Sequence, residues 1–274
     1  ASVEACRQAD AVLLGAMGLP DVRWPDGTEM RPQVDLRFLL DLYAGLRPIY
    51  LYTADHCPLK GYGPGDIDFV LLRENVEGLF ASMNGGIQLR GETAVDSMVI
   101  TRTGTERIVR YAFELAQQRS GARSGNPPGR VTCVDKANIF RSMAFFRQIF
   151  DEVGAGYPAI TADHAYVDAM ALYLVRQPQT YDVLVAENMF GDILSDLAAG
   201  LVGGLGMAPS GDIGEDAAVF QPVHGTAPDI AGQGVANPVG TILSAAMMWR
   251  WLGHRHDDEE ALAAAARIED AVRL

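Results

Sequence analysis

The stretch FGDILSDLAAG, residues 190–200, gives the strongest indication of fold and function in this chain. Its apolar residues recur at helical spacing, which predicts a helix over Phe190 to Ala199. Asp192 and Asp196 are four positions apart, so both carboxylates project from one face and can reach a common cation. Hard oxygen ligands of this kind suit Mg²⁺ or Mn²⁺. The alternative is that one Asp caps the helix and the other is solvated.

Short apolar runs elsewhere alternate with helical periodicity, which indicates parallel strands joined by crossover helices in an α/β fold. The expected strands are Ala11 to Gly15, Ile67 to Arg73, Val131 to Asp135 and Tyr181 to Ala186. Further helices are expected over Asn138 to Glu152, Asp163 to Arg176, Pro238 to Leu252 and Asp258 to Val272. A capping box of Thr103 and Glu106 predicts the start of another helix.

Two segments read as irregular. Glu77 to Asp96 contains glycines without clear periodicity, which predicts a projecting hairpin or arm. Gly121 to Gly129, GARSGNPPG, has the composition of a surface loop.

Composition narrows the class of protein. The chain has 274 residues, 49% of them hydrophobic, which is enough to bury a sizeable core. A net charge of -13 argues against nucleic-acid and anionic-membrane partners, because the chain has no excess of basic residues. The three cysteines lack paired spacing, there is no signal peptide pattern, and no apolar stretch approaches the ~20 residues of a membrane span. We therefore expect a cytoplasmic protein without nucleic-acid or membrane partners.

Two further side chains fit a metal-dependent reaction. Lys136 follows a predicted strand, and it is one of only two lysines in the chain. A lysine that is partly buried beside a metal can act as a base for a substrate hydroxyl. Asp168 lies in an apolar helical pattern, where a carboxylate is costly unless it is paired or binds a metal. A surface lysine and a surface Asp are the alternatives.

Arginines and one long loop supply candidate binding groups. Arg37, Arg47 and Arg73 could bind carboxylates with their guanidinium forks, although each alone reads as a surface residue. The loop from Pro222 to Pro238 consists almost entirely of turn-forming residues, and a loop of this kind is typical of a binding site. Its Asp229 could accept both ribose hydroxyls of NAD and would repel the 2′-phosphate of NADP. No GxGxxG fingerprint follows a strand, so a Rossmann fold is not expected.

Several long motifs occur together in this order: LRP, REN followed by EG, VDKAN, YVDAM, FGDILSDLAAG, GLGMAPSG and PVHGTAPDIAGQGVANP. Together they resemble the metal-dependent β-decarboxylating dehydrogenases, the family of isocitrate, isopropylmalate, homoisocitrate, tartrate and D-malate dehydrogenases. The resemblance covers nearly the whole chain. It implies an isopropylmalate-dehydrogenase-like two-domain α/β fold and a homodimer whose active sites both subunits complete.

The resemblance also implies a division of the chain. Residues 1–42 and 204–274 would form the larger, cofactor-side domain, incomplete at both ends, because the chain begins after the family's first strand and helix and stops before its final helices. Residues 43–203 would form the smaller substrate, metal and dimerisation domain, with the arm near residues 77–96 serving dimerisation.

The resemblance assigns roles to individual residues. Arg37, Arg47 and Arg73 would bind the substrate carboxylates, and Lys136 from the partner would be the base. Mg²⁺ or Mn²⁺ would be held by Asp192 and Asp196 with Asp168 from the partner. The NAD contacts would be Asn138, His224, Gly225, Thr226, Ala227, Pro228, Asp229 and Asn237. The implied reaction is oxidation and decarboxylation of a (2R)-malate-type acid.

The chain departs from the family at Phe80. The family has a tyrosine there that protonates the enolate, and a phenyl ring has no proton to donate. A catalytically weak or silent subunit that pairs with an active paralogue is therefore the alternative function. The specificity segment, Glu29 to Asp35, mixes apolar and polar residues and does not select among isopropylmalate, D-malate and tartrate.

Overall fold

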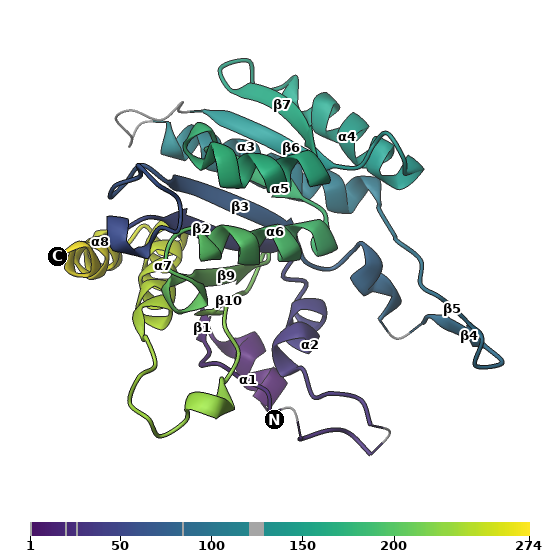
Figure 1. Ribbon diagram of the computed structural model, residues 1–274, viewed down its shortest axis with the longest axis horizontal. Coiled ribbons are helices and arrows are strands. Elements are labelled where there is room, and N and C mark those ends of the chain that lie inside the picture. Colours follow the sequence, from purple (N-terminus) through teal and green to yellow (C-terminus); the bar gives the residue numbers. More distant parts are fainter. Residues whose placement is uncertain (1, 20, 26, 84, 121–128) are drawn as a thin grey trace.

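The computed structural model describes residues 2–19, 21–25, 27–83, 85–120 and 129–274 (Figure 1). Its centre is an eight-stranded mixed sheet with strand order β1-β10-β9-β2-β3-β8-β6-β7. The strands are β1 (Val12–Leu13), β2 (Ala44–Tyr50), β3 (Asp68–Glu74), β6 (Arg130–Asp135), β7 (Thr161–Tyr166), β8 (Val183–Ala186), β9 (Pro209–Ile213) and β10 (Ala218–Pro222). The loop expected over Gly121 to Gly129 lies, except for Gly129, outside the described residues.

Half of the sheet is parallel, as the apolar runs predict. Strands β3, β8, β6 and β7 all run in the same direction, with Val183 of β8 opposite both Val70 of β3 and Val131 of β6. The carboxyl ends of these strands therefore lie at one edge of the sheet. That edge is where ligands bind in α/β proteins.

The other half is mixed: β1 pairs parallel with β10, whereas the neighbouring pairs among β10, β9, β2 and β3 are antiparallel. Strand β2 pairs antiparallel with β3 and with β9, and β9 pairs antiparallel with β10. A short turn closed by the Gly214 N–H and the Ala217 carbonyl, 2.8 Å apart, joins β9 to β10. A turn of this length cannot carry the crossover that a parallel pair needs, so the strands must run in opposite directions.

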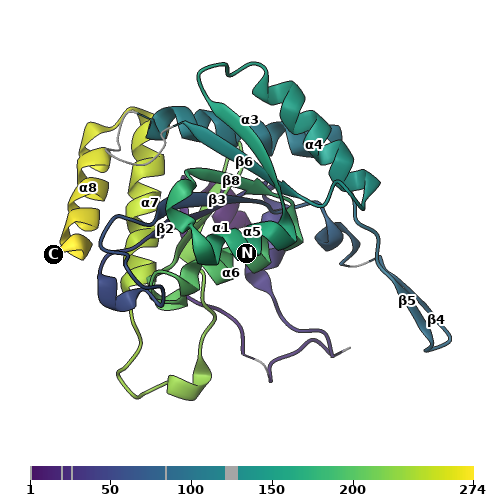
Figure 2. The same ribbon diagram turned by 45° about the horizontal axis from the view of Figure 1, so that its top comes forward.

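Helices cover both faces of the sheet. Helices α3 and α4 lie over one face of the parallel half, and α5 and α6 lie over the opposite face (Figures 1 and 2). Helix α7 packs against β9 and β10, and α8 packs against α7. The helices are α1 (Ser2–Gln8), α2 (Pro32–Leu39), α3 (Arg102–Arg119), α4 (Arg141–Gly154), α5 (Val167–Arg176), α6 (Asn188–Gly200), α7 (Val239–His256) and α8 (Glu259–Arg273).

The core lies between the parallel strands and α3, α4 and α6. Phe69 of β3, Phe113 of α3 and Phe146 of α4 are almost fully buried there, and so is Val185 of β8. Burying one such aromatic side chain contributes about 1.5–3 kcal/mol. The packing of these large side chains therefore fixes the edge that carries the candidate site.

Three predicted helix starts were wrong, and the first is that of α4, which begins at Arg141 and not at Asn138. The side chain of Thr101, not Thr103, accepts a hydrogen bond from the Gly104 N–H at 3.0 Å and caps α3. The carboxylate of Glu106 instead pairs with Arg102. Residues Thr161–Tyr166, partly assigned to a helix, form β7, because they pair with β6 at the edge of the sheet. Helical periodicity in the next residues hid the strand.

The predicted arm is a hairpin that projects from the body of the molecule (Figures 1 and 2). It consists of β4 (Ile87–Leu89) and β5 (Thr93–Val95), which pair antiparallel. Three of its apolar side chains are exposed, Ile87 by 56%, Leu89 by 55% and Val95 by 47%. A hairpin with this much open apolar surface is suited to contact another chain.

The predicted division into two domains is not apparent as a break in the sheet. Strand β2, from the part expected to be the smaller domain, pairs with β9 from the other part. The loop over Pro222 to Pro238 has one short 3₁₀ turn, η5 (Pro228–Ile230), and is otherwise irregular as expected. Among the described helices, none is both long and apolar enough to cross a bilayer.

Candidate active site

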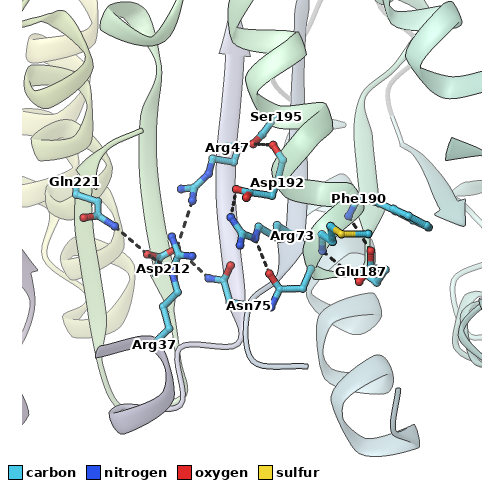
Figure 3. A network of polar contacts seen from close by, with 12 residues as sticks. Arg37, Arg47, Arg73, Asn75, Glu187, Phe190, Asp192, Ser195, Asp212 and Gln221 are labelled. Carbon is cyan, nitrogen blue, oxygen red and sulfur yellow. Dashed lines mark hydrogen bonds and ion pairs between the residues drawn. The ribbon is translucent and has the colours of Figure 1, made fainter. Parts of the chain in front are cut away.

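The three predicted binding arginines are buried and lie close together; we call them the arginine cluster (Figure 3). Arg37 of α2 is 6% exposed, Arg47 of β2 is 4% exposed and Arg73 of β3 is 2% exposed. The sequence alone favoured a surface position for each of them, and that expectation was wrong. Buried arginines are rare unless they are paired, so their shared position calls for anionic partners.

One internal partner is Asp212 of β9, a fully buried carboxylate. It accepts hydrogen bonds from Arg37 Nε at 3.0 Å, Asn75 Nδ2 at 2.9 Å and Gln221 Nε2 at 3.2 Å, and Arg47 Nη2 lies 3.8 Å away (Figure 3). Burial by itself raises the pKa of Asp212, but the charges of Arg37 and Arg47 outweigh burial and hold that pKa below its usual value. Asp212 is therefore ionised at neutral pH.

Arg47 is only partly satisfied. Its Nε and Nη1 atoms are buried and have no hydrogen-bond partner. Burial lowers the pKa of Arg47, against the opposing effect of Asp212. A guanidinium nevertheless stays charged in proteins, and leaving its donors buried and unpaired costs free energy. An anionic group that accepts these two donors would remove the cost.

Arg73 links the cluster to the helix of the opening motif. Its Nε donates to Asn188 Oδ1 at 2.9 Å, and its Nη1 pairs with Asp192. The guanidinium carbon lies 4.9 Å from the centre of the Phe80 ring, in cation–π geometry. Helix α6 comes this close because residue 191 is Gly, where a Cβ atom would lie 2.8 Å from Arg73 Cβ.

Asp192 and Asp196 lie one helical turn apart on α6, as predicted. Burial, and then the charge of Asp192, raise the pKa of Asp196. Two like charges that disfavour each other in this way are suited to a divalent cation between them. Among the described residues, however, no three acidic, His or Cys side chains gather closely enough to form a metal centre. A complete metal site would need at least one further ligand besides Asp192 and Asp196.

Helix α6 is itself held by Glu187, which caps its start by accepting from Phe190 N at 2.7 Å and Met189 N at 3.2 Å (Figure 3). Asn188 next to it donates to the Glu77 carbonyl at 3.0 Å and so ties α6 to the base of the arm.

Sequence reasoning missed Asn75, Asn188, Asp212 and Gln221. Asn75 lies in the REN motif and fits against β2 because residue 45 is Gly, where a Cβ atom would approach Asn75 Oδ1 to 2.7 Å. Asp212 follows the GLGMAPSG motif directly, but nothing in its local pattern separates a buried Asp from a turn Asp.

Lys136 and Asp168 form a separate pair. Lys136 follows β6 and Asp168 is in the first turn of α5, with Lys136 Nζ 2.6 Å from Asp168 Oδ1. The hydrogen bond from Lys136 lowers the pKa of Asp168. The Asp168 side chain is 68% exposed, which is the surface position that the sequence analysis gave as the alternative. Asn138, on the same segment as Lys136, is also exposed.

The loop predicted to bind adenosine is open to solvent over most of its length. Gly225, Ala227, Pro228, Asp229 and Asn237 are exposed, whereas His224 and Thr226 are half-buried. The loop is fixed in part by Ala227, whose φ of 43° lies in the left-handed region.

His224 Nδ1 lies 2.8 Å from the Gly225 carbonyl oxygen, while its Nε2 is buried without a partner. Thr226 Oγ1 donates to the Gly18 carbonyl. The Asn237 side chain holds the start of α7 by accepting from Val239 N at 3.0 Å. The loop thus combines open backbone with one unsatisfied imidazole nitrogen.

A cavity of about 380 Å³ lies between α2 and the 3₁₀ turn η2 (Leu79–Ser82). Its lining residues are Asp35, Phe38, Leu39, Phe80, Ala81 and Met83. Phe80 is therefore shared between this mostly apolar cavity and the arginine cluster.

Comparison with known proteins gives one consistent result. The sequence profile of the isocitrate/isopropylmalate dehydrogenase family matches residues 1–274. The chain is 45% identical over 272 residues to a 3-isopropylmalate dehydrogenase of Corynebacterium efficiens, covering 97% of this chain and 75% of that protein.

Two solved structures have similar folds. The crystal structure of isocitrate dehydrogenase from Methylococcus capsulatus matches with a TM-score of 0.84 and 40% identity, over 99% of this chain and 74% of that one. A β-decarboxylating dehydrogenase of Thermococcus kodakarensis in its apo form matches with a TM-score of 0.73 and 42% identity, over 92% of this chain and 68% of that one. These matches confirm the resemblance drawn from the motifs and the fold class it implied. The chain therefore belongs to the isocitrate/isopropylmalate dehydrogenase family, and by that membership it is a β-decarboxylating dehydrogenase.

Proposed function

We propose that this chain catalyses the NAD-dependent oxidative decarboxylation of a (2R)-malate-type 2-hydroxy acid, with Mg²⁺ or Mn²⁺ bound to its aspartates. The observation that carries the proposal is the arginine cluster, in which Arg47 keeps two buried N–H donors without a partner. A carboxylate of the substrate is the natural acceptor for these donors. The substrate class comprises isopropylmalate, D-malate and tartrate.

Substrate binding would depend on the arginines and the neighbouring aspartates together. Arg37, Arg47 and Arg73 bind the carboxylates, and their burial strengthens each contact because water competes poorly there. Asp192 and Asp196 hold the divalent cation, which their spacing on α6 and the raised pKa of Asp196 support. Asp168 from a second copy of the chain would supply the third carboxylate.

The chemical role of the chain is to position the acid and move one proton. Lys136 of the partner accepts the proton of the 2-hydroxyl. When bound, the cation would supply Lewis acidity and NAD would supply the hydride acceptor. Closely placed charges of this kind stabilise negative charge on the substrate after CO₂ leaves.

The cofactor would lie along the loop from Pro222 to Pro238. The unpartnered His224 Nε2 offers a nitrogen to the adenine, and the exposed Asp229 can accept the ribose hydroxyls and repel a 2′-phosphate. Gly225, Thr226, Ala227, Pro228 and Asn237 line the remaining contacts with the adenosine half. Asn138, close in sequence to Lys136, would meet the nicotinamide.

Two copies of the chain would form a homodimer. The Asp168 side chain is 68% exposed and that of Lys136 is 22% exposed, so both can be reached by a neighbouring chain. Exposed apolar side chains also occur on α5 and α6, where Leu172 is 52%, Val175 is 43% and Ile193 is 61% exposed. Patches of this kind mark protein interfaces. The arm near residues 77–96 would contribute to this contact.

We also retain the division into a cofactor-side part, residues 1–42 and 204–274, and a substrate part, residues 43–203. The predicted cofactor loop belongs to the first part, and the arginine cluster, the metal-binding aspartates and Lys136 lie mostly in the second. The three free cysteines support a cytoplasmic location.

A second function is favoured by one observation. Phe80 contacts Arg73 at the position where the family has its proton-donating tyrosine, and a phenyl ring cannot protonate the enolate. The chain could thus be a weak or silent subunit that pairs with an active paralogue. The preserved arginines, aspartates and Lys136 favour the active enzyme.

The decisive experiment is an assay of NADH formation with Mn²⁺ on isopropylmalate, D-malate, tartrate, isocitrate and homoisocitrate, with CO₂ release measured separately. We expect NADH and CO₂ from one of the first three acids. NADH without stoichiometric CO₂ would point to Phe80 as the limiting residue. No turnover of any acid would refute the active-enzyme proposal and favour the silent subunit.

A further inference from the structure

Asp212 is a buried carboxylate in the arginine cluster to which neither the motifs nor the proposed reaction assign a role. It lies on β9, whereas its partners come from α2, β2, β10 and the segment after β3. It is completely buried, so it can act only through the side chains around it.

Each carboxylate oxygen of Asp212 lies next to a different arginine. Its Oδ2 accepts from Nε of Arg37 at 3.0 Å, and its Oδ1 lies 3.8 Å from Nη2 of Arg47. Because a guanidinium is planar, the hydrogen bond from Arg37 Nε fixes the direction of the other nitrogens of Arg37, whereas Asp212 attracts Arg47 as an ion pair without a hydrogen bond. In Arg47 the nitrogens left over are Nε and Nη1, which are buried and have no partner.

We propose that Asp212 is a positioning residue for substrate binding, which orients Arg37 and Arg47 so that their remaining donors meet one carboxylate of the 2-hydroxy acid. This inference rests on the proposed function, because it takes the arginine cluster as the substrate site.

Two neutral side chains keep Asp212 in place. Asn75 Nδ2 and Gln221 Nε2 donate to it at 2.9 and 3.2 Å. Asn75 itself is confined by the backbone of Gly45, where any added Cβ would meet its amide oxygen at 2.7 Å. The carboxylate therefore has a fixed orientation that it can impose on the arginines. It also separates two buried like charges that would otherwise repel each other.

The test is Asp212→Asn, which keeps the shape and removes the charge. We expect the KM for the 2-hydroxy acid to rise about ten-fold or more, since hydrogen bonds to charged groups are lost, while the KM for NAD stays within about two-fold. A merely electrostatic role predicts the opposite sign, because the variant makes the cluster more positive and would bind an anion more tightly. An unchanged or lower KM for the acid would overturn the proposal.

A double-mutant cycle with Arg37→Lys separates positioning from general stability. If Asp212 acts through Arg37, the two substitutions together should raise the KM by much less than the product of their separate effects. Full additivity would contradict the proposal. Asp182→Asn is the matched control, because Asp182 is also fully buried and pairs with Arg119 at 2.8 Å. It should lower the melting temperature and leave the KM for the acid unchanged.

Gln221→Leu keeps the proposal testable if Asp212→Asn does not fold. It removes one hydrogen bond to Asp212 without stranding a buried charge, so we expect a smaller rise in the KM for the acid, of about two- to five-fold. No rise would count against positioning.

The wild-type protein separates this proposal from the proposed function. If wild type turns over an acid and neither Asp212→Asn nor Gln221→Leu raises the KM, only the role of Asp212 fails. If wild type neither turns over nor binds D-malate with Mn²⁺ in calorimetric titration, both fail.

Discussion

The arginine cluster and the Lys136–Asp168 pair carry most of the proposed chemistry, but they are built in opposite ways. Arg37, Arg47 and Arg73 are almost fully buried and are held by side chains of the same chain. Lys136 donates a hydrogen bond to Asp168, and the Asp168 side chain is 68% exposed. One region is organised within a single chain, whereas the other faces outward.

This difference explains why one copy of the chain does not assemble the proposed metal centre. The described residues of one chain bring no three metal-binding side chains together, although Asp168, Asp192 and Asp196 are all present. If a second copy brings its Lys136 and Asp168 to the arginine cluster, both regions become halves of one site. Dimerisation then controls catalysis, because neither half suffices.

The largest expected effect comes from removing Lys136, the proposed base. Lys136→Met should lower kcat by about 10²–10⁴-fold with little change in the affinity for the acid, because the proton of the 2-hydroxyl then has no acceptor. Steady-state NADH formation measures it. Lys60→Met is the control, since Lys60 is the other lysine of the chain and is exposed. Equal rates for Lys136→Met and wild type would exclude Lys136 as the base.

Mixing two inactive variants tests whether the halves come from different copies. Lys136→Met and Asp192→Asn should each be nearly inactive alone. After co-refolding in equal amounts, about a quarter of wild-type activity should return, because half of the dimers are mixed and each contains one intact site. If the activity stays at the level of the separate variants, each active site takes both residues from the same copy, which contradicts the proposal that two copies share a site.

Phe80 gives a smaller effect on the arginine side. Phe80→Tyr should raise the overall rate by about ten-fold if protonation of the enolate limits turnover, since the hydroxyl supplies the missing proton and the ring can still contact Arg73. Release of CO₂ and NADH should be followed together. Phe38→Tyr, in the same cavity wall, is the control and should change nothing. A rate unaffected by Phe80→Tyr would remove the argument about the final step.

The smallest effect concerns the buried carboxyl next to Arg73. Burial raises the pKa of Glu74 from 4.5 to about 7, with a smaller contribution from the charge of Glu77, while backbone N–H donors of residues 76 and 77 and Arg107 oppose it. The folded protein therefore binds more protons than the unfolded chain between pH 4.5 and 7. The contribution of Glu74 to the free energy of unfolding is therefore complete below pH 4.5 and is lost as the pH rises through 7.

Glu74→Gln should remove that loss. As the pH rises from 5 to 8, we expect the melting temperature of Glu74→Gln, measured by calorimetry, to gain a few degrees relative to that of wild type. Glu114→Gln, an exposed position on α3, should show no such gain. If the melting temperatures of wild type and Glu74→Gln change with pH in parallel across this range, Glu74 is ionised in both the folded and the unfolded state.

Local sequence patterns predicted the elements that depend on neighbouring residues. The helix of FGDILSDLAAG, the strand before Lys136, the irregular loop from Pro222 to Pro238 and the projecting arm all occur where expected. Strands β2, β9 and β10 were missed, because they contain Pro48, Pro209 and Pro222, respectively, and lack the alternation that identifies a half-buried strand.

The sequence by itself determined which residue types are available: two aspartates one helical turn apart, a lysine at a strand end and a loop of turn-formers. These follow from spacing along the chain, which fixes the face of a helix and the end of a strand. Tertiary structure alone decided that three arginines become buried together and that Asp212, 175 residues from Arg37, becomes their partner. The reason is physical: burial and pairing depend on which strands lie side by side, and packing between distant segments sets that arrangement.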